Sequence, residues 1–254
     1  MSYIIFDLDE TLLDSERQVT EYTKSVLEKL RECGHKIVIN TARSKILTDG
    51  LIQLIRPDFT ILCAGAGILD AGGRYIYKCE IPKETVEAIS RELSSRGRLF
   101  SIQADPYFHT NNPQFIRYDT VQFNPECFTY DFDSPKLVAN LGEGGDAEAE
   151  YFASKYGIDT VRYFDGPLYR FSHKDATKAK GNSALVRIHG DSERDIIAFG
   201  DDNGDVDMLL EAGLGVIMKN ARDEIKAKIR HVTEYTNNEN GVARFLVKHF
   251  DLNM

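Results

Sequence analysis

The chain has 254 residues, 42% of them hydrophobic, and a formal net charge of −9 from 31 Lys and Arg against 40 Asp and Glu. This length allows one large domain or two small ones, and the hydrophobic content argues against a disordered chain. The acidic balance argues against binding to nucleic acid or to an anionic membrane. Because no apolar run is long enough to span a membrane and no signal peptide precedes the first predicted strand, we expect a cytoplasmic protein.

The first predicted element is a strand over residues 3–6, an unbroken run of Tyr, Ile, Ile and Phe. Such a run is typical of a strand that is buried on both faces. Asp7 and Asp9 follow it at its carboxyl end, where open α/β sheets bind ligands. Two carboxylates on one side of an extended chain repel each other unless a divalent cation or a retained proton compensates. Asp7 therefore suits a nucleophile and Asp9 an acid or base, although a solvated acidic turn is the alternative for this stretch alone.

The next elements alternate between helix and strand. Apolar residues at helical spacing end at Gly34, and residues 35–40 form a second buried strand that leads to Thr41. A helix over about residues 44–55 and a third strand over residues 59–63 follow. Short connections between such elements predict right-handed crossovers and a parallel sheet.

This alternation breaks in the middle of the chain and resumes near residue 178. Residues 79–174 mix helices with antiparallel-looking strands, which predicts a separate α+β domain inserted between residues 1–78 and 175–254. A helix over residues 178–189 and a strand over residues 195–199 then lead to a run of acidic residues. We therefore predict an α/β fold, a Rossmann-like parallel sheet flanked by helices that is interrupted by the inserted domain.

Four segments far apart in the sequence are predicted to meet at the carboxyl edge of this sheet. They contribute residues whose types match the needs of phosphoryl transfer: a carboxylate that attacks phosphorus, a hydroxyl and an ammonium that hold phosphoryl oxygens, and carboxylates for Mg²⁺. These residues are Asp7, Asp9, Thr41, Lys180, Asp201 and Asp205.

The same segments resemble the four motifs of the haloacid dehalogenase-like (HAD) superfamily. They read Phe-Asp-Leu-Asp-Glu-Thr-Leu from Phe6, Asn-Thr-Ala-Arg from Asn40, Lys-Gly-Asn-Ser-Ala-Leu from Lys180 and Gly-Asp-Asp-Asn-Gly-Asp from Gly200. The order and spacing resemble those of Cof-type phosphatases, which carry a large α/β cap of type IIB between the second and third motifs. The resemblance extends over the whole chain.

The resemblance implies a role for each matching residue. Asp7 would form an aspartyl-phosphate, and Asp9 would protonate the leaving oxygen and then activate water. Thr41 and Lys180 would bind the phosphoryl group, with Lys178 as a competitor of Lys180. The residues implied around Mg²⁺ are Asp7, Asp9, Asp201, Asp205 and the backbone carbonyl of Leu8. Candidates for contact with the rest of the substrate are Arg43, Asn220, Phe108, His109 and Asn111, with Asn112 and Tyr118 beside the last three.

Several residues depart from the family pattern. Glu10 and Ala42 each stand where many relatives have Gly, and Ala64 stands where many have Asn. Gly204 replaces an Asn before Asp205, so a hydrogen bond from that position must come from elsewhere, with Asn203 as a candidate.

These observations predict a Mg²⁺-dependent phosphomonoester hydrolase that acts on a small phosphorylated metabolite such as a sugar phosphate. A phosphosugar mutase shares this layout and would be recognised by isomerised product in place of free phosphate. A phosphatase of protein substrates conflicts with the large insertion, which restricts access. A non-catalytic phosphometabolite sensor or a dehalogenase would not need an acid at Asp9.

Overall fold

The computed structural model describes residues 1–115, 120–163 and 166–253. The chain forms two compact units. The first, which we call the core, comprises Met1–Arg43, Thr48–Tyr77 and Thr177–Met254; the second, the cap, comprises Ser44–Leu47 and Lys78–Ala176. The sequence placed the boundaries after residues 78 and 174, close to these positions. Among the described residues, no helix combines the length and apolar character that crossing a bilayer requires.

The core is built on an eight-stranded sheet with the order β14-β13-β12-β1-β2-β3-β4-β5. The strands from β14 to β3 run parallel, and β4 pairs antiparallel with β3. Their bounds are β1 Tyr3–Phe6, β2 Lys36–Asn40, β3 Phe59–Leu62, β4 Gly67–Asp70, β5 Tyr75–Lys78, β12 Ile196–Gly200, β13 Leu214–Ile217 and β14 His231–Val232. The predicted parallel sheet is therefore confirmed.

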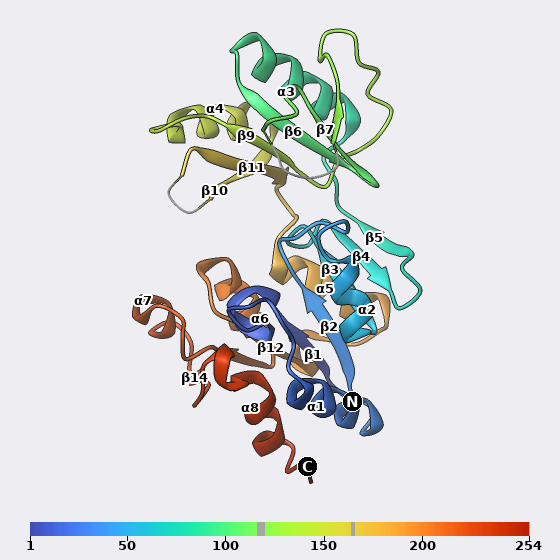
Figure 1. Cartoon of the computed structure of the whole chain (residues 1–254), viewed down its shortest axis with the longest axis vertical. Coiled ribbons are helices and arrows are strands. Elements are labelled where there is room, and N and C mark those ends of the chain that lie inside the picture. Colours follow the sequence, from blue (N-terminus) through green and yellow to red (C-terminus); the bar gives the residue numbers. More distant parts are fainter. Residues whose placement is uncertain (116–119, 164–165, 254) are drawn as a thin grey trace. The chain divides into compact units, whose positions relative to one another are not determined.

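Helices cover both faces of the core sheet (Figure 1). The helices are α1 Glu21–Glu32, α2 Asp49–Ile55, α5 Lys178–Ile188, α6 Val206–Glu211, α7 Asp223–Lys226 and α8 Gly241–His249. Ile4 and Phe6 of β1 belong to one hydrophobic cluster with residues of α1 and α8, whereas Ile5 belongs to a second cluster with residues of α5 and α6. Burial on both faces explains why β1 reads as a continuous apolar run.

The cap contains a six-stranded sheet with the order β10-β11-β9-β6-β7-β8. All its pairings are antiparallel except that of β7 with β8. Its elements are α3 Lys83–Ser95, β6 Leu99–Ala104, β7 Tyr107–Thr110, β8 Thr120–Gln122, β9 Leu137–Asn140, α4 Asp146–Tyr156, β10 Ile158–Arg162 and β11 Leu168–His173.

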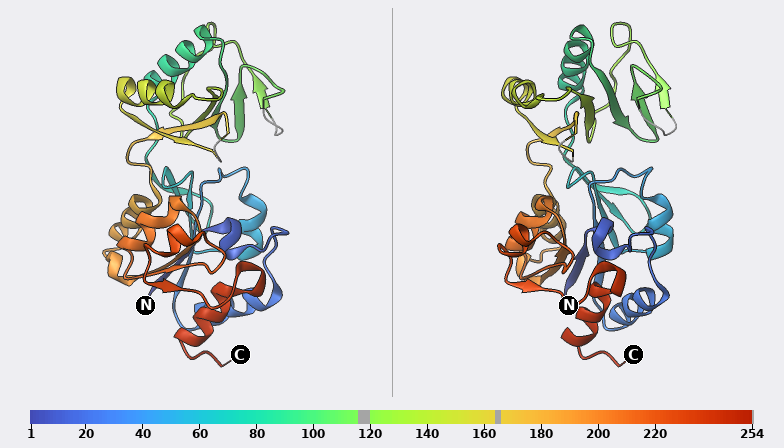
Figure 2. Two further views of the ribbon diagram at one scale, coloured as in Figure 1. Left: turned by 90° about the vertical axis from the view of Figure 1, so that its left-hand side faces the viewer. Right: turned by 60° about the vertical axis from the view of Figure 1, so that its left-hand side comes forward.

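Both cap helices pack on the same face of this sheet (Figures 1 and 2). Val86, Ile89 and Leu93 of α3 share a hydrophobic cluster with Phe100 of β6 and Phe171 of β11. The helices therefore cover one face of the cap sheet, and no helix among the described residues covers the other face.

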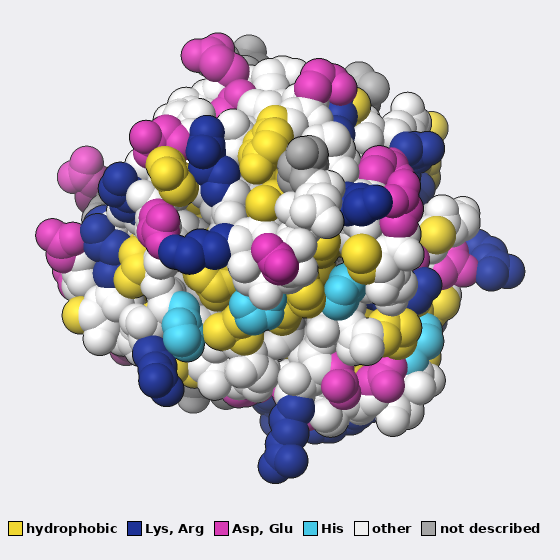
Figure 3. All heavy atoms as spheres, turned by 90° about the horizontal axis from the view of Figure 1, so that it is seen from below, with side chains coloured by type: hydrophobic (Ala, Val, Ile, Leu, Met, Phe, Trp, Pro, Cys, Tyr) yellow, Lys and Arg dark blue, Asp and Glu magenta, His cyan; other side chains and the backbone are white. Residues whose placement is uncertain are grey.

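Seen from below, the molecular surface mixes Lys and Arg with Asp and Glu, and hydrophobic and His side chains lie between them (Figure 3). The acidic residues on this face therefore do not form a single negatively charged patch, despite the net negative charge of the chain.

Candidate active site

Asp7 lies at the carboxyl end of the central strand β1. Its backbone N–H donates to the carbonyl of Phe199 in β12 (3.0 Å), so the parallel pairing continues to this residue. The chain then turns tightly through Leu8–Leu12, where Leu8 and Leu12 are buried. The carbonyl of Leu8 accepts a hydrogen bond from the Leu13 N–H (2.9 Å). That carbonyl is thus engaged in closing the turn, and its role as a metal ligand stays a prediction.

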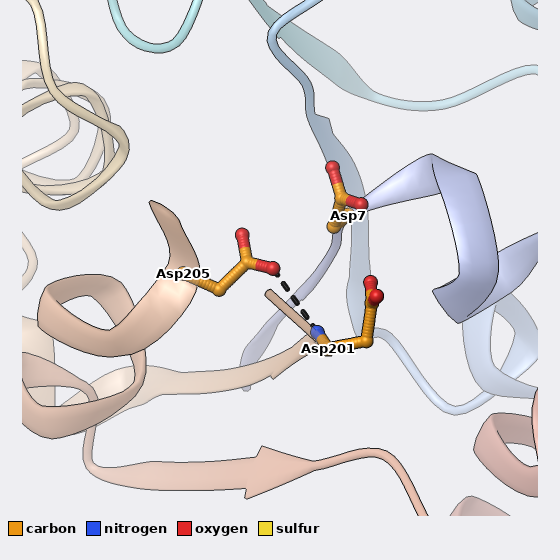
Figure 4. A group of neighbouring side chains, drawn as sticks. All are labelled: Asp7, Asp201 and Asp205. Carbon is orange, nitrogen blue, oxygen red and sulfur yellow. Dashed lines mark hydrogen bonds between the residues drawn. The ribbon is translucent and has the colours of Figure 1, made fainter. Parts of the chain in front are cut away.

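Three carboxylates gather at this edge of the sheet (Figure 4). Asp7 follows β1, Asp201 follows β12, and Asp205 ends the short helical turn Asn203–Asp205. One carboxylate oxygen from each lies within 4.8 Å of the other two. Asp7 and Asp205 are buried, at 8% and 1% exposure. A buried cluster of oxygen ligands suits a divalent cation such as Mg²⁺, which also cancels the mutual repulsion of the carboxylates.

Local hydrogen bonds hold two of these carboxylates in place. One oxygen of Asp205 accepts from the backbone N–H groups of Asp201 (3.0 Å) and Asp202 (3.1 Å). The hydroxyl of Thr11 donates to Asp201 (2.8 Å). The Asp205 side chain packs so closely on Gly200 that a Cβ there would lie 2.5 Å from the Cβ of Asp205, which requires glycine at this strand end. Asp205 therefore shapes the loop that carries Asp201.

The lysine that contacts the carboxylates is Lys178, whereas the sequence analysis favoured Lys180. The Lys178 ammonium donates to Asp7 and to Asp205, each at 2.6 Å, and the side chain is 9% exposed. Lys180 is exposed. Two residues apart on a helix point about 200° apart, so only one of these lysines faces the site.

Two glycines and one asparagine bring the start of α5 to the sheet edge. A Cβ on Gly65 would lie 2.1 Å from the Thr177 carbonyl oxygen, and one on Gly181 would lie 2.9 Å from the Cα of Gly65. The amide of the buried Asn40 donates to the carbonyl of Lys178 (2.9 Å). These close approaches place Lys178 within reach of Asp7.

Burial sets the charge balance of the site. Desolvation raises the pKa of Asp7 to about 7, although the Lys178 ammonium opposes the shift. Desolvation, with the Asp7 charge next in importance, raises the pKa of Asp201 to about 8. The two neighbouring carboxylates hold the pKa of Lys178 above its ordinary value, although burial alone would lower it. Burial therefore favours the protonated form of Asp7 and Asp201 in the metal-free site, and a bound cation would favour the ionised form.

Asp9 lies outside the three-carboxylate cluster. Its carboxylate is 49% exposed and forms a two-point ion pair with Arg43, whose Nε donates to it at 2.9 Å. The Asp9 carboxylate is not among the three that gather, and the prediction that Asp9 is a metal ligand stays a prediction. Arg43, predicted to contact the substrate, holds the predicted acid/base in this structure.

Thr41 lies at the end of β2, as its place in the sequence predicted. It is 1% exposed, and its hydroxyl oxygen accepts from the backbone N–H of Arg43 (3.1 Å). The hydroxyl keeps its own proton for donation to an anion.

Asn220 braces the loop after Asp9. Its amide nitrogen donates to the carbonyl of Glu10 (2.8 Å), and its oxygen accepts from the Asn237 N–H (3.0 Å). Asn220 therefore supports the loop, and its role as a substrate contact stays a prediction. Glu10 has a φ of 55°, in the left-handed region that favours glycine. Hydrogen bonds from Asn220 and Asn237 to Glu10 offset the strain of a non-glycine residue there.

The cap residues predicted to contact substrate divide between the two sides of the sheet. His109 packs among Phe123, Phe128 and Phe132, with ring centroids 5.2–6.3 Å apart, and burial lowers its pKa. The Asn111 amide accepts from the Phe100 N–H of β6 (3.0 Å) and donates to the carbonyl of Arg98 just before that strand (2.8 Å). His109 and Asn111 thus support the cap fold, and their contact with substrate stays a prediction.

The three other cap candidates have different outcomes. Phe108 is 6% exposed and lies opposite Gln103, away from the helices, so its role stays a prediction. Asn112 accepts a hydrogen bond from the Gln114 N–H (2.9 Å) within its own turn. Tyr118 lies outside the described residues.

The structure shows the surroundings of three residues involved in the departures from the family pattern. Ala64 has a φ of 56°, which asparagine tolerates better than alanine. A Cβ on Gly204 would meet nothing within 4 Å, so the missing side chain leaves open space. Asn203 accepts from Lys228 (3.2 Å).

Sequence reasoning did not single out Thr11, Asn40 or the pairing of Asp9 with Arg43. Thr11 carried a usable signal, since it stands two residues after Asp9 in the first motif. Nothing in the sequence indicated that Asp9 pairs with Arg43. The two residues follow different strands, and the reach of their side chains brings them together.

Comparison with known proteins gives one consistent picture. Residues 4–246 match the family model described as haloacid dehalogenase-like hydrolase. A 5-amino-6-(5-phospho-D-ribitylamino)uracil phosphatase of Bacillus subtilis is 28% identical, over 98% of this chain and 97% of its own. A pyridoxal phosphate phosphatase of Escherichia coli is 24% identical, over 97% of both chains.

Solved structures share the fold. An HAD subclass IIB sugar phosphatase superimposes with a TM-score of 0.78 at 24% identity, over 99% of both chains. The resemblance that the four motifs carry and the predicted fold class are both confirmed.

Proposed function

Because the chain belongs to the haloacid dehalogenase-like hydrolases and to the phosphatases among them, we propose that it is a Mg²⁺-dependent phosphomonoester hydrolase acting through an aspartyl-phosphate. The observation that carries this proposal is the buried cluster of Asp7, Asp201 and Asp205 with Lys178 in hydrogen-bond contact with Asp7. We place the enzyme in the cytoplasm, where small phosphorylated metabolites are its substrates.

The donor set fits Mg²⁺. Carboxylate oxygens are the ligands it prefers, and Asp7 and Asp201 would hold it while Asp205 orders the loop of Asp201. When bound, the ion supplies positive charge that shields the attacking carboxylate from the phosphate dianion.

The chemical steps fall to residues of the chain. In the first, an oxygen of Asp7 attacks phosphorus, the bond from phosphorus to the leaving oxygen breaks, and Asp9 gives that oxygen a proton. In the second, Asp9 takes a proton from water, the resulting hydroxide attacks the phosphorus, and the Asp7 carboxylate leaves. After the second step, Asp7 is again a free carboxylate and Asp9 is again protonated.

Lys178 and Thr41 bind the phosphoryl group in this proposal. The Lys178 ammonium already contacts Asp7, so it neutralises charge on the carboxylate that becomes bonded to phosphorus. The Thr41 hydroxyl donates to a phosphoryl oxygen. Arg43 holds the Asp9 carboxylate in position until the leaving oxygen replaces Arg43 as the hydrogen-bond partner of Asp9.

Metal dependence tests the proposal. Phosphate release from p-nitrophenyl phosphate should vanish in excess chelator and return with added Mg²⁺. Asp201→Ala should weaken Mg²⁺ activation by at least about tenfold, because it removes one of the few ligands. Asp202→Ala is the matched control, since that exposed carboxylate caps the turn Asn203–Asp205 by accepting from the Asn203 N–H. Full activity in excess chelator would contradict the proposal.

The raised pKa values of Asp7 and Asp201 predict a pH-dependent metal effect on stability. For each acid the folded pKa, about 7 and about 8, lies above its ordinary value of 3.8, so the metal-free protein loses stability as pH rises through this window. Mg²⁺ removes that loss because it pairs with the ionised carboxylates. The Mg²⁺-induced rise in Tm should therefore be larger at pH 8.5 than at pH 6, as measured by thermal melting.

Asp201→Asn should reduce this pH dependence, whereas Asp202→Asn should leave it unchanged. An Mg²⁺ effect on Tm that is equal at both pH values would show that metal binding does not displace protons from the site.

A further inference from the structure

Cys79 and His173 meet at the two ends of the longer cap segment. That segment runs Lys78–Ala176, so Cys79 is its second residue and His173 is the fourth from its end. The Cys79 Sγ lies 3.2 Å from the His173 Nδ1, within hydrogen-bond distance for sulfur. A thiol in contact with an imidazole nitrogen is the pairing on which reactive cysteines depend. Neither side chain takes part in the proposed phosphatase reaction.

Backbone hydrogen bonds within the cap hold both residues in place. His173 is the last residue of β11, and its carbonyl accepts from the Ala176 N–H (2.8 Å), which closes a turn after the strand. Cys79 precedes Ile81 by two residues, and the Ile81 N–H donates to the carbonyl of Ser134 (2.8 Å). The sulfur and the imidazole therefore meet between two anchored stretches of backbone.

A second hydrogen bond to the imidazole shows which group carries the proton. The Asp175 N–H donates to the same His173 Nδ1 (3.1 Å), so this nitrogen is an acceptor in the neutral ring. The Cys79 thiol then donates its S–H to Nδ1. Transfer of that proton gives a thiolate beside an imidazolium, and the Asp175 carboxylate, 3.9 Å from Nδ1, favours the positive ring. His173 is thus placed to act as a base toward Cys79.

The exposure of the cysteines gives an internal comparison. Cys79 is partly exposed, and the side chain of His173 is 30% exposed, so a small molecule can approach the pair. Cys33 and Cys127 are both more exposed than Cys79. In the part of the chain that the structure describes, neither has a histidine within hydrogen-bond distance. Exposure alone would therefore rank Cys33 and Cys127 ahead of Cys79 in reactivity, whereas activation by an imidazole ranks Cys79 first.

We propose that Cys79 is a site of reversible modification by small disulfides, with His173 as the base that activates it. The S–H proton moves to the His173 Nδ1, the Cys79 sulfur attacks one sulfur of the disulfide, and the S–S bond breaks. The released thiolate takes the proton from the imidazolium. A thiol and a disulfide thus give a mixed disulfide and a thiol, and no further oxidant is needed.

The modification has a structural consequence within the cap. The adduct removes the S–H group that donates to His173, so it releases the contact between the two ends of the segment Lys78–Ala176. An excess of a reducing thiol reverses the exchange and restores that contact.

Glutathione disulfide is the probe that tests this proposal. The intact protein is incubated with an excess of it at neutral pH, and peptide mass spectrometry follows the adduct at each cysteine. The adduct at Cys79 should form at least about tenfold faster than at Cys33 or Cys127, and dithiothreitol should remove it. Faster modification of Cys33 or Cys127 than of Cys79 would overturn the inference.

His173→Gln tests the role of the base. This variant should lower the rate of modification at Cys79 by about tenfold or more and change the rate at Cys127 by less than about twofold. His231→Gln is the matched control, because it removes an exposed histidine from β14 in the core. Circular dichroism verifies that both variants are folded.

An unchanged or higher rate at Cys79 in His173→Gln would show that the imidazole does not activate the thiol, and the proposal would fail. The readout is the mass of the adduct, not phosphate release. The test therefore gives its answer whether or not the proposed phosphatase function holds.

Discussion

Asp7→Asn is expected to reduce phosphate release by several powers of ten, because an amide cannot replace the carboxylate as nucleophile. The same change removes one of three crowded carboxylates from a buried site. Since burial raises the pKa of Asp7 to about 7, its ionisation costs stability at higher pH. The metal-free variant should therefore melt no lower than wild type at pH 8 despite its inactivity.

The measurements are single-turnover phosphate release and thermal melting without metal. Asp207→Asn is the control, because it removes an exposed carboxylate from α6, the helix that follows Asp205. A loss of only a few-fold in kcat would contradict the assignment of Asp7 as the nucleophile.

Lys178→Met is expected to have the second largest effect, and it should change both activity and stability. The ammonium holds Asp7 and Asp205 at 2.6 Å in a buried site. Removing one partner of a buried ion pair leaves unpaired charge, which costs roughly 3–5 kcal/mol. Loss of a charged group at the phosphoryl oxygens should lower kcat/KM by about a hundredfold or more.

Lys180→Met is the matched control, because it removes the same side chain from the exposed side of the same helix. Adding Mg²⁺ should restore part of the stability of Lys178→Met, since the ion neutralises the same carboxylates, but it should not restore activity. If Lys180→Met were the inactive variant, the assignment of Lys178 would be wrong.

The two lysines show where sequence reasoning reached its limit. Both lie at the start of one predicted helix, and the resemblance to the family favoured Lys180. Each residue turns a helix by about 100°, so a shift of one or two positions in where the helix begins decides which side chain faces the sheet edge. The helix begins at Lys178, after its cap Thr177, and the close packing of Gly65 on Thr177 sets its position. These contacts join distant segments, so spacing along the chain does not report them.

The sequence by itself determined the sheet and the edge at which the site forms. Buried strands read as apolar runs, and the residue after a parallel strand must lie at its carboxyl end, so the sequence positions of Asp7, Thr41 and Asp201 place them at this edge. Tertiary structure alone decided which long side chains meet. It placed Asp9 on Arg43 and outside the carboxylate cluster, and it engaged the amides of Asn111 and Asn220 with backbone groups. The reason is that a backbone pattern fixes the direction of a strand, whereas the partner of a flexible polar side chain depends on which groups folding brings within hydrogen-bond distance.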